Sequence, residues 1–267
     1  MNHHPRKRFG QNFLRDDAVI SAIEQAISPV EDDHLVEIGP GTGALTGAIV
    51  ESGCRLDVIE LDRDLKAGLL ASFSIYPQFT LHSADALAFD FGSLVDNGQK
   101  LRVIGNLPYN IATPLIMRLL DQKHWVQDMH FMLQLEVVER LAAKPGTKAW
   151  GRLGVMAQYH CEVEQLIEVP PEAFYPPPKV QSAVVRLTPH TRQPWPEVDL
   201  ELLRQVVAQA FSQRRKTLRN NFKNIYNDAA FESLGIDPSQ RAEMLELKDF
   251  IALTTLAHAT DKLKRTG

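Results

Sequence analysis

Short apolar runs and amphipathic segments alternate along residues 34–187, and this alternation limits the possible folds more than any other feature. It predicts a parallel sheet with helices on both faces, because parallel strands are joined by crossover connections that cover the sheet. The expected fold class is therefore α/β with a mostly parallel sheet. The first four predicted strands are His34–Ile38, Leu56–Glu60, Phe79–His82 and Leu101–Ile104, and the first crossover helix begins at about Thr46.

The end of this region departs from the alternation. Met129–Gln134 predicts a fifth strand and Glu136–Ala143 a helix, and then the strands Val163–Val169 and Val180–Leu187 follow without a crossover helix. The segment that joins them, Pro170–Lys179, carries five prolines and predicts a stiff, extended loop. Strands joined in this way pair most simply as antiparallel neighbours, so we expect an antiparallel strand at the sheet edge.

The segment 190–197, which follows Pro189 and has prolines at 194 and 196, predicts a linker that divides the chain. The first predicted domain is 1–189, and it begins with a basic arm at 1–15. The sequence after the linker shows no strand pattern, so residues 198–267 predict a small all-α domain. The first helices expected there are Leu200–Phe211 and Arg214–Asn220.

The chain has a net charge of −4, but its positive charge is concentrated in two segments. Four basic residues lie in 1–15 and six in 204–223, and neither segment contains an acidic residue. The rest of the chain therefore has a net charge of −14. Such a distribution is typical of a selective polyanion binder, and it also fits two solvated charged faces.

Several classes of protein are excluded by composition. The sequence has no apolar run of about eighteen residues, as a membrane-spanning helix requires, and its N-terminus lacks the apolar core of a signal peptide. Cys54 and Cys161 are too few for a disulfide framework, so a reducing cytoplasm is the expected location. The nine histidines show no ligand spacing, and we expect no metal site.

A glycine loop, 39–43, follows the first strand and opens a helix. Glycines permit the sharp turn that presents backbone N–H groups to a ligand at a helix N-terminus. Glu60 ends the next strand, where a carboxylate can accept hydrogen bonds from both hydroxyls of a ribose. The loop and the acid predict a nucleoside cofactor. Gly39, Gly41 and Ala44 also satisfy a dinucleotide pattern, and a tight turn without a ligand is the simplest alternative.

Asp85 and Ala86 come at the carboxyl end of the third predicted strand, where ligands of open α/β sheets bind. Asp85 can accept a hydrogen bond from the exocyclic amine of an adenine. An aspartate in this position is, taken alone, more often a cap or turn residue.

The tetrapeptide Asn106-Leu107-Pro108-Tyr109 follows the fourth strand and indicates the chemistry. The exocyclic amine of a purine is a poor nucleophile, because its lone pair is delocalised, so an enzyme must hold the amine hydrogens with acceptors. The Asn106 side chain and the Leu107 backbone carbonyl can be those acceptors, while Pro108 stiffens the loop. Tyr109 offers a ring on which an extruded base can stack, a contact worth about 1–3 kcal/mol. An ordinary proline turn with a core tyrosine is the alternative.

Seven segments along the chain form one set: Lys7–Leu14, Glu37–Gly43, Glu60, Asp85, Asn106–Tyr109, Phe174–Ser182 and Phe211–Asn221. In these segments the sequence resembles the ribosomal RNA adenine N6-dimethyltransferase family of S-adenosylmethionine enzymes, over nearly its whole length. The resemblance implies a Rossmann-like methyltransferase domain, a helical RNA-binding domain and a monomer. It also implies dimethylation of two adjacent adenosines near the 3′ end of 16S rRNA, in a pre-assembled small-subunit particle. Leu135 and Trp150 depart from the common Lys and Tyr, outside the predicted active site.

The resemblance further implies roles for individual residues. Asn12 and Leu14 would close over the methionine part of the cofactor, and Phe174 would stack on the adenine opposite Tyr109. The expected cofactor-binding residues are Gln11, Asn12, Leu14, Gly39, Gly41, Gly43, Glu60, Asp85, Ala86 and Asn106. The expected phosphate contacts are Arg6, Lys7, Arg8, Lys179, Arg214, Arg215, Lys216 and Arg219, of which some can instead pair with acidic side chains.

Three other functions fit parts of the sequence. The glycine loop alone permits a nicotinamide-dependent dehydrogenase, in which the tetrapeptide and the basic segments have no purpose. An adenine methyltransferase acting on DNA shares the logic of the tetrapeptide but not the basic motif near the C-terminus. A non-enzymatic factor for small-subunit assembly also fits, and such a role is compatible with catalysis.

Overall fold

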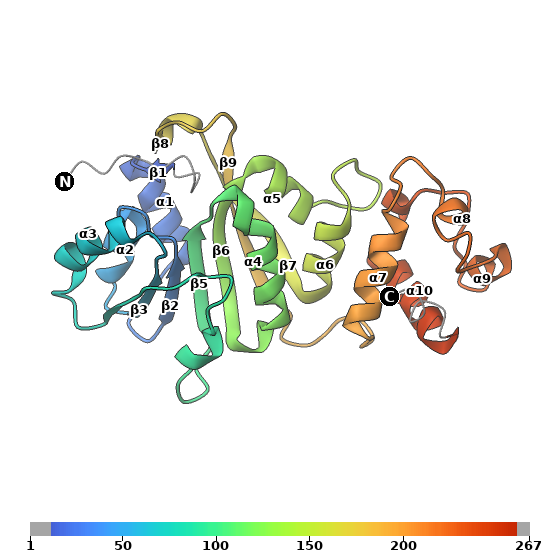
Figure 1. Ribbon diagram of the computed structural model, residues 1–267, viewed down its shortest axis with the longest axis horizontal. Coiled ribbons are helices and arrows are strands. Elements are labelled where there is room, and N and C mark those ends of the chain that lie inside the picture. Colours follow the sequence, from blue (N-terminus) through green and yellow to red (C-terminus); the bar gives the residue numbers. More distant parts are fainter. Residues whose placement is uncertain (1–11, 261–267) are drawn as a thin grey trace. The chain divides into compact units, whose positions relative to one another are not determined.

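A seven-stranded sheet forms the centre of the first of two compact units (Figure 1). This computed structural model describes residues 12–260, apart from the side chains of Tyr109 and Thr260. The strand order is β4-β3-β2-β5-β6-β9-β7, in which β4 to β6 run parallel and β9 lies antiparallel to β6. The strands are β2 (His34–Ile38), β3 (Arg55–Ile59), β4 (Phe79–His82), β5 (Leu101–Asn106), β6 (Val126–Gln134), β7 (Cys161–Val169) and β9 (Ser182–Pro189). The predicted mostly parallel sheet with an antiparallel edge is confirmed.

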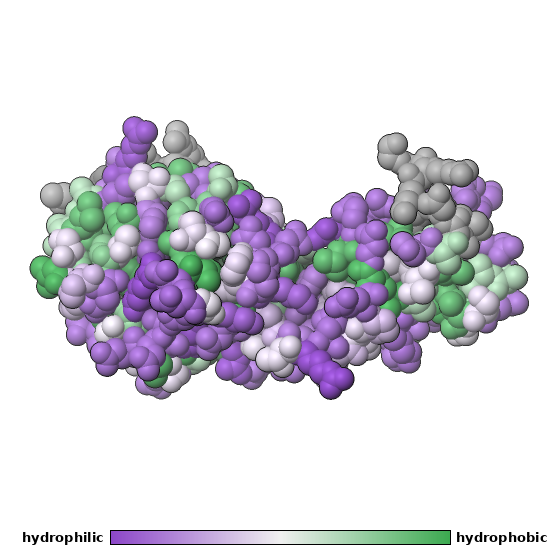
Figure 2. Space-filling model, turned by 90° about the horizontal axis from the view of Figure 1, so that it is seen from below, coloured by the Kyte–Doolittle hydropathy of each residue, from purple (hydrophilic) through white to green (hydrophobic). Residues whose placement is uncertain are grey.

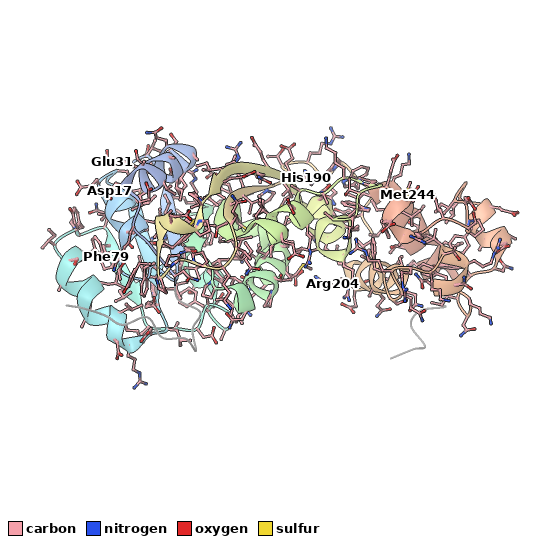
Figure 3. The ribbon with its side chains drawn as sticks, turned by 90° about the horizontal axis from the view of Figure 1, so that it is seen from above. Asp17, Glu31, Phe79, His190, Arg204 and Met244 are labelled. Carbon is pink, nitrogen blue, oxygen red and sulfur yellow. The ribbon has the colours of Figure 1, made fainter. Side chains whose placement is uncertain are left out.

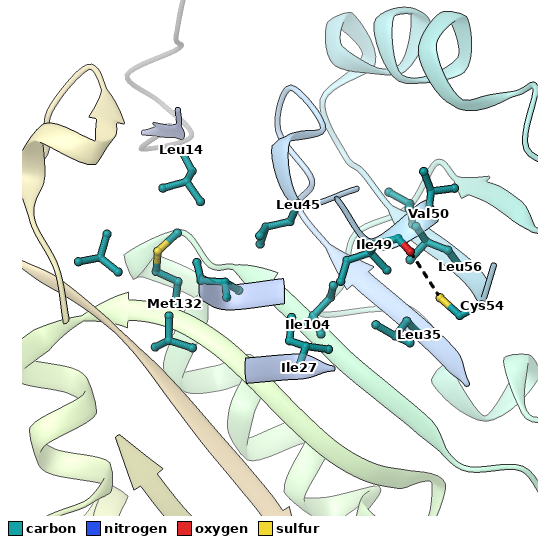
Figure 4. Packing of buried hydrophobic residues seen from close by; sticks show 14 of the residues in the cluster. Leu14, Ile27, Leu35, Leu45, Ile49, Val50, Cys54, Leu56, Ile104 and Met132 are labelled. Carbon is teal, nitrogen blue, oxygen red and sulfur yellow. Dashed lines mark hydrogen bonds between the residues drawn. The ribbon is translucent and has the colours of Figure 1, made fainter. Parts of the chain in front are cut away.

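Helices cover both faces of this sheet. The helices α1 (Asp17–Ile27) and α2 (Ala44–Val50) pack against Leu35, Ile104 and Met132 of the sheet in one buried cluster (Figure 4). Because side chains alternate along a strand, the neighbouring buried residues of the same strands face the other side. The helix α4 (Tyr109–Asp121) contacts β6, and the views from the front and from above place α1 and α4 on opposite faces (Figures 1 and 3).

Local sequence signals fix where the helices begin. The Asp16 side chain accepts hydrogen bonds from the first backbone N–H groups of α1, and Asp62 caps α3 (Arg63–Phe73) in the same way. Helix α2 begins at Ala44, two residues before the predicted start, because the positive φ of Gly43 (89°) ends the loop there. Shorter segments are η2 (Phe91–Leu94), η3 (Lys123–Trp125) and α5 (Leu135–Leu141), of which α5 ends in the second unit.

A two-stranded antiparallel sheet, absent from the predictions, lies beside the main one. It pairs β1 (Phe13–Leu14) with β8 (Phe174–Tyr175), so a segment near the N-terminus contacts the proline-rich segment. That segment is therefore not a single extended loop, because the turn η4 (Pro171–Ala173) precedes β8. Phe174 and Tyr175 lie between prolines and keep their backbone N–H groups, so they can pair in a sheet where prolines cannot.

Among the described residues, the second compact unit contains Glu139–Cys161 in addition to 190–260. These units differ from the predicted division, which placed all of 1–189, and so Glu139–Cys161, in the first domain. The Trp150 Nε1 donates a 2.9 Å hydrogen bond to the Leu245 carbonyl. Helix α6 (Arg152–His160) packs against α7 (Leu200–Ala210) and α10 (Leu247–Thr260). The helices of 190–260 are α7 (Leu200–Ala210), α8 (Leu218–Asn221), α9 (Asp228–Glu232), η5 (Ala242–Met244) and α10 (Leu247–Thr260).

The helix predicted at Arg214–Asn220 is only partly present. Turns occupy residues 211–216, and α8 starts at Leu218 after Thr217, which has an extended backbone. The Asn221 Nδ2 donates a 2.6 Å hydrogen bond to the Ala210 carbonyl at the end of α7, which folds the chain back between the two helices. The basic segment is therefore a turn held between two helix ends.

The face of the molecule shown in Figure 2 is largely polar. Hydrophilic side chains cover most of the face seen in Figure 2, with apolar ones scattered among them. No helix within residues 12–260 is long and apolar enough to cross a membrane.

Candidate active site

A cavity of about 360 Å³ lies at the carboxyl ends of β2, β3 and β5. Ligands of open parallel sheets bind at this edge, and the volume is within the range of about 300–1,000 Å³ for small-molecule sites. The structure brings together residues that the sequence predicted from separate motifs. Those that line the cavity are Asn12, Leu14, Gly39, Gly41, Glu60, Asp85, Ala86, Asn106, Leu107, Pro108 and Phe174.

The glycine loop forms the floor of the cavity with a backbone that only glycine adopts readily. Gly39 and Gly41 have φ angles of 64° and 61°, and the Gly39 N–H donates to the Ile59 carbonyl at 3.0 Å. A Cβ atom on Gly41 would lie 2.9 Å from Phe13 Cδ1. Phe13 therefore packs directly on the loop, and a larger residue at Gly41 would displace it.

Gly43 has a different place from the one predicted. It does not line the cavity, and a Cβ atom there would lie 2.5 Å from Phe73 Cε2. The glycine at this position allows α2 to approach α3 closely. Its contribution to the site is to set the start of α2.

Glu60 is a buried acceptor at the end of β3. The Asp62 N–H donates to Glu60 Oε1 at 2.6 Å. Burial raises the pKa of the Glu60 carboxyl, and hydrogen bonds from the backbones of Asp62, Leu61 and Gly41 oppose that rise. A carboxylate has about four lone-pair sites, so these bonds fix its orientation while leaving room for a ligand hydroxyl.

Glu37 is a functional candidate to which the sequence analysis gave no role of its own, although it begins the segment Glu37–Gly43. It lies near the end of β2 in the cavity wall, fully buried, and accepts a 2.6 Å hydrogen bond from the Thr46 hydroxyl. Burial raises the pKa of Glu37 to about 7, with the Thr46 hydrogen bond opposing the rise and the nearby Glu60 adding to it. The sequence signal that could have identified Glu37 is an acidic residue within the predicted buried strand 34–38.

Asp85 is a turn residue that also lines the cavity. Its Oδ1 accepts a 2.9 Å hydrogen bond from the Leu87 N–H, as a turn residue does. It also lines the cavity together with Ala86. A turn aspartate with a second oxygen facing a ligand is compatible with this arrangement.

Asn106 is the last residue of β5, and a hydrogen bond fixes its side-chain amide. The Asn106 Nδ2 donates to the Asn12 carbonyl at 3.1 Å, which leaves the side-chain carbonyl as an acceptor. The preceding Gly105 is a second residue that the sequence reasoning missed. A Cβ atom on it would lie 2.5 Å from the Ile38 carbonyl oxygen, so only glycine permits this approach of β5 to β2.

The structure describes the side chain of Phe174 but not that of Tyr109, the other predicted stacking residue. Helix α4 begins at Tyr109 directly after Pro108, and the Tyr109 side chain is outside the described part. Phe174 is 5% exposed, packs in the same buried cluster as Leu14, and lines the cavity. The predictions for Gln11, Arg6, Lys7 and Arg8 also lie outside the described residues.

The basic residues of the second unit fall into two groups. Arg214 donates hydrogen bonds to the carbonyls of Lys148 and Trp150, and Arg219 forms a 2.7 Å ion pair with Asp228. Arg215 and Lys216 are exposed, and among residues 12–260 the side chain of neither has a hydrogen bond or an ion pair. In the first unit, Lys179 is likewise exposed.

The groups that line the cavity fit a nucleoside cofactor. It offers a loop of close-packed backbone, a buried acid and polar groups at the ends of neighbouring strands. In the part of the chain that the structure describes, no group of three or more His, Cys, Asp or Glu side chains has a geometry that could hold a metal ion.

Two solved structures share the fold of this chain. A dimethyladenosine transferase from Plasmodium falciparum has a TM-score of 0.78 at 23% identity, covering 94% of this chain and 98% of its own. The 23S rRNA methyltransferase ErmE has a TM-score of 0.73 at 24% identity, covering 91% and 98%. With the strand order, these similarities show that the chain has the same Rossmann-like α/β fold as these two methyltransferases.

Sequence comparison is more specific. A sequence model described as ribosomal RNA adenine dimethylase matches residues 2–258, and the chain belongs to that family. The small-subunit ribosomal RNA methyltransferases A of Pseudomonas aeruginosa and Saccharophagus degradans are 57% and 56% identical over 251 and 252 residues. Each match covers 94% of both sequences.

The family assignment establishes the activity. The chain is an rRNA adenine N6,N6-dimethyltransferase in a family of S-adenosylmethionine-dependent methyltransferases. The dehydrogenase and the DNA methyltransferase that single motifs left open are therefore wrong.

Proposed function

We propose that this enzyme uses S-adenosylmethionine to dimethylate two adjacent adenosines near the 3′ end of 16S rRNA, in a pre-assembled small-subunit particle in the cytoplasm. One observation carries the proposal. The glycine loop, Glu60, Asp85 and the segment Asn106–Pro108 come from four places in the chain and line a single cavity. Cofactor-binding groups and amine acceptors thereby face one another across a space of suitable size.

The cofactor half of the cavity is formed by three strand ends. Glu60 accepts hydrogen bonds from the ribose hydroxyls, and Asp85 accepts one from the adenine amine of the cofactor. Asn12 and Leu14 close over its methionine part above the glycine loop. The bound cofactor supplies the methyl group on a sulfonium, so the attacking amine displaces a neutral thioether and then releases one proton. Neither a general acid nor a metal is required for such a leaving group.

The acceptor half is formed by the residues after β5. The Asn106 side-chain carbonyl and the Leu107 backbone carbonyl hold the hydrogens of the target amine, so that its lone pair points at the methyl group. Tyr109 and Phe174 hold the extruded adenine between their rings. Catalysis by these residues is positioning, which can supply most of the rate when the leaving group needs no help.

The RNA reaches this site as a flipped nucleotide, which is possible only where the base is unpaired or extruded. Arg215 and Lys216 contact phosphates with their free charges, and Lys179 and the arm residues Arg6, Lys7 and Arg8 add to this binding. Arg214 and Arg219 hold the shape of the basic turn through their own partners. The enzyme acts as a monomer.

The test is methylation of unmodified small-subunit particles with a methyl-labelled cofactor, followed by nuclease digestion and identification of the nucleoside by mass spectrometry. We expect N6,N6-dimethyladenosine at two adjacent positions. Asn106→Ala should abolish the product, while Gln25→Ala, which removes an exposed amide on α1, should not. Full dimethylation by Asn106→Ala would exclude Asn106 as an acceptor, and a different modified nucleoside would overturn the proposed function.

A further inference from the structure

Residues 12–16, which we call the strap, join the two halves of the proposed active site. At one end, the Asn12 carbonyl accepts the 3.1 Å hydrogen bond from Asn106 Nδ2. In the middle, β1 pairs antiparallel with β8, with Leu14 opposite Phe174 and Phe13 opposite Tyr175. At the other end, Asp16 caps α1. The amine acceptor and the proposed stacking ring are thus held by the same five residues.

The register of the strap places successive side chains on two faces, and these faces pack against different parts of the protein. Leu14 and Phe174 lie opposite each other and pack into the main buried cluster. Phe13 lies on the other face, where it packs on the glycine loop at Gly41. Any displacement of the strap would therefore disturb the loop, the ring and the acceptor together.

Backbone hydrogen bonds and a ring contact hold the strap against the proline-rich segment, beside the packing of Leu14 on Phe174. The N–H groups of Arg15 and Asp16 both donate to the Ala173 carbonyl, at 2.8 and 3.3 Å. The Arg15 guanidinium carbon lies 4.2 Å from the centre of the Tyr175 ring, a cation–π contact. Tyr175 is 50% exposed, so its ring is largely solvated and the core does not depend on it. A two-stranded sheet this short is marginal alone, so this side-chain contact affects how often it opens.

We propose that Arg15 and Tyr175 are positioning residues: their contact keeps the strap paired with β8 and thereby aligns Asn106 and Phe174. This inference rests on the proposed function of those two residues. An exposed cation–π contact contributes a factor of about two to five to an equilibrium, so its loss should open the strap more often by that factor. Neither Arg15 nor Tyr175 needs to touch the cofactor or the base.

A direct contact between Arg15 and RNA phosphate is the competing explanation, because Arg15 belongs to the basic segment 1–15. The two explanations differ in what happens before RNA is added. Loss of a positioning contact changes the protein even without RNA. Replacing either Arg15 or Tyr175 then has the same effect. A phosphate contact changes only the affinity for RNA and the dependence of that affinity on salt. Only the Arg15 variant would show this change.

The test measures hydrogen exchange in peptides covering 13–18, without RNA or cofactor, in Arg15→Gln, Tyr175→Leu, the double variant and Tyr175→Phe. We expect exchange about two- to fivefold faster in each single variant and no further increase in the double variant. Tyr175→Phe keeps the ring and should restore slow exchange. Lys100→Gln removes an exposed charge from the same unit and serves as the matched control.

Turnover on small-subunit particles provides the second readout. We expect kcat to fall, and to fall equally in the two single variants. The KM for the particle should stay unchanged. Unchanged exchange in both single variants would overturn the inference, as would a higher KM in Arg15→Gln alone. The exchange result stands apart from the proposed function, which fails instead if the unaltered protein forms no dimethyladenosine.

Discussion

The Thr46 hydroxyl donates a 2.6 Å hydrogen bond to the carboxyl group of Glu37, and both residues are buried beneath the cofactor cavity. The bond joins the end of β2 to the first turn of α2, on either side of the glycine loop. The acid on which it depends has a pKa raised to about 7 by burial. The protonation of one group therefore affects the base of the loop at near-neutral pH.

Glu37→Gln should remove a pH dependence of stability. Because the pKa of Glu37 rises from 4.5 in the unfolded chain to about 7 in the folded one, its stabilisation is complete below pH 4.5 and is lost as pH rises through 7. Glutamine stays neutral and keeps a carbonyl for Thr46. At pH 8 the variant should exceed the unaltered protein in free energy of unfolding by roughly 2–4 kcal/mol. Urea denaturation between pH 5 and 8 measures this, with exposed Glu31→Gln as the control. Parallel stability curves for Glu37→Gln and the unaltered protein would contradict the raised pKa.

Gly41→Ala should weaken both folding and cofactor binding. Alanine at a φ of 61° costs about 1–2 kcal/mol, and its Cβ would lie 2.9 Å from Phe13 Cδ1, so the ring must move. Gly98→Ala is the matched control, since Gly98 has a φ of 76° and no atom within 4 Å of the added Cβ. Thermal unfolding and calorimetric binding of S-adenosylhomocysteine distinguish the two. Equal stability losses with unchanged affinity would show that the contact with Phe13 does not matter.

Glu60→Gln should lower the affinity for S-adenosylhomocysteine by about 10- to 100-fold, because hydrogen bonds to a charged acceptor are worth about 1.5–3 kcal/mol. The change keeps the size of the side chain, so the fold should survive. Isothermal titration calorimetry measures the affinity, and Glu162→Gln on an exposed position of β7 is the control. An affinity within twofold of the unaltered protein would remove Glu60 from the cofactor site.

Replacing Arg215 and Lys216 together by glutamine should make RNA binding less dependent on salt. Each phosphate contact contributes about 0.7–0.9 to the slope of log affinity against log salt concentration, so the slope should fall by up to about two. Lys248→Gln is the control, because the Lys248 ammonium already pairs with Glu246 at 2.8 Å. Filter binding at several salt concentrations measures the slope. An unchanged slope would assign the phosphate contacts to other residues.

The sheet and most of the cavity were predictable because their signals are local. An apolar run of five or six residues predicts a buried strand, and the glycine loop, Glu60 and Asn106 each follow such a run directly. Strand ends in a parallel sheet meet at one edge, so placing the motifs at strand ends placed them in one site.

The features that were not predicted depend on contacts between distant segments. Strands of two residues, such as β1 and β8, carry no periodic pattern, and their pairing is visible only in the folded chain. The membership of Glu139–Cys161 in the second unit depends on bonds such as that from Trp150 to Leu245. Partners of the individual arginines in the basic turn are also set by the fold, since Arg219 finds Asp228 on another helix.

The close approach of Gly105 to Ile38 has a consequence for how relatives of this enzyme can diverge. With 2.5 Å between a would-be Cβ and a backbone oxygen, any side chain at Gly105 would push the strand that carries the proposed amine acceptor away from the cofactor loop. Under the proposed function, the gap between methyl donor and target amine is a property of the sheet itself. A new RNA target would then be acquired by changing the loops and the helical unit that present the nucleotide, while the reaction distance is inherited unchanged.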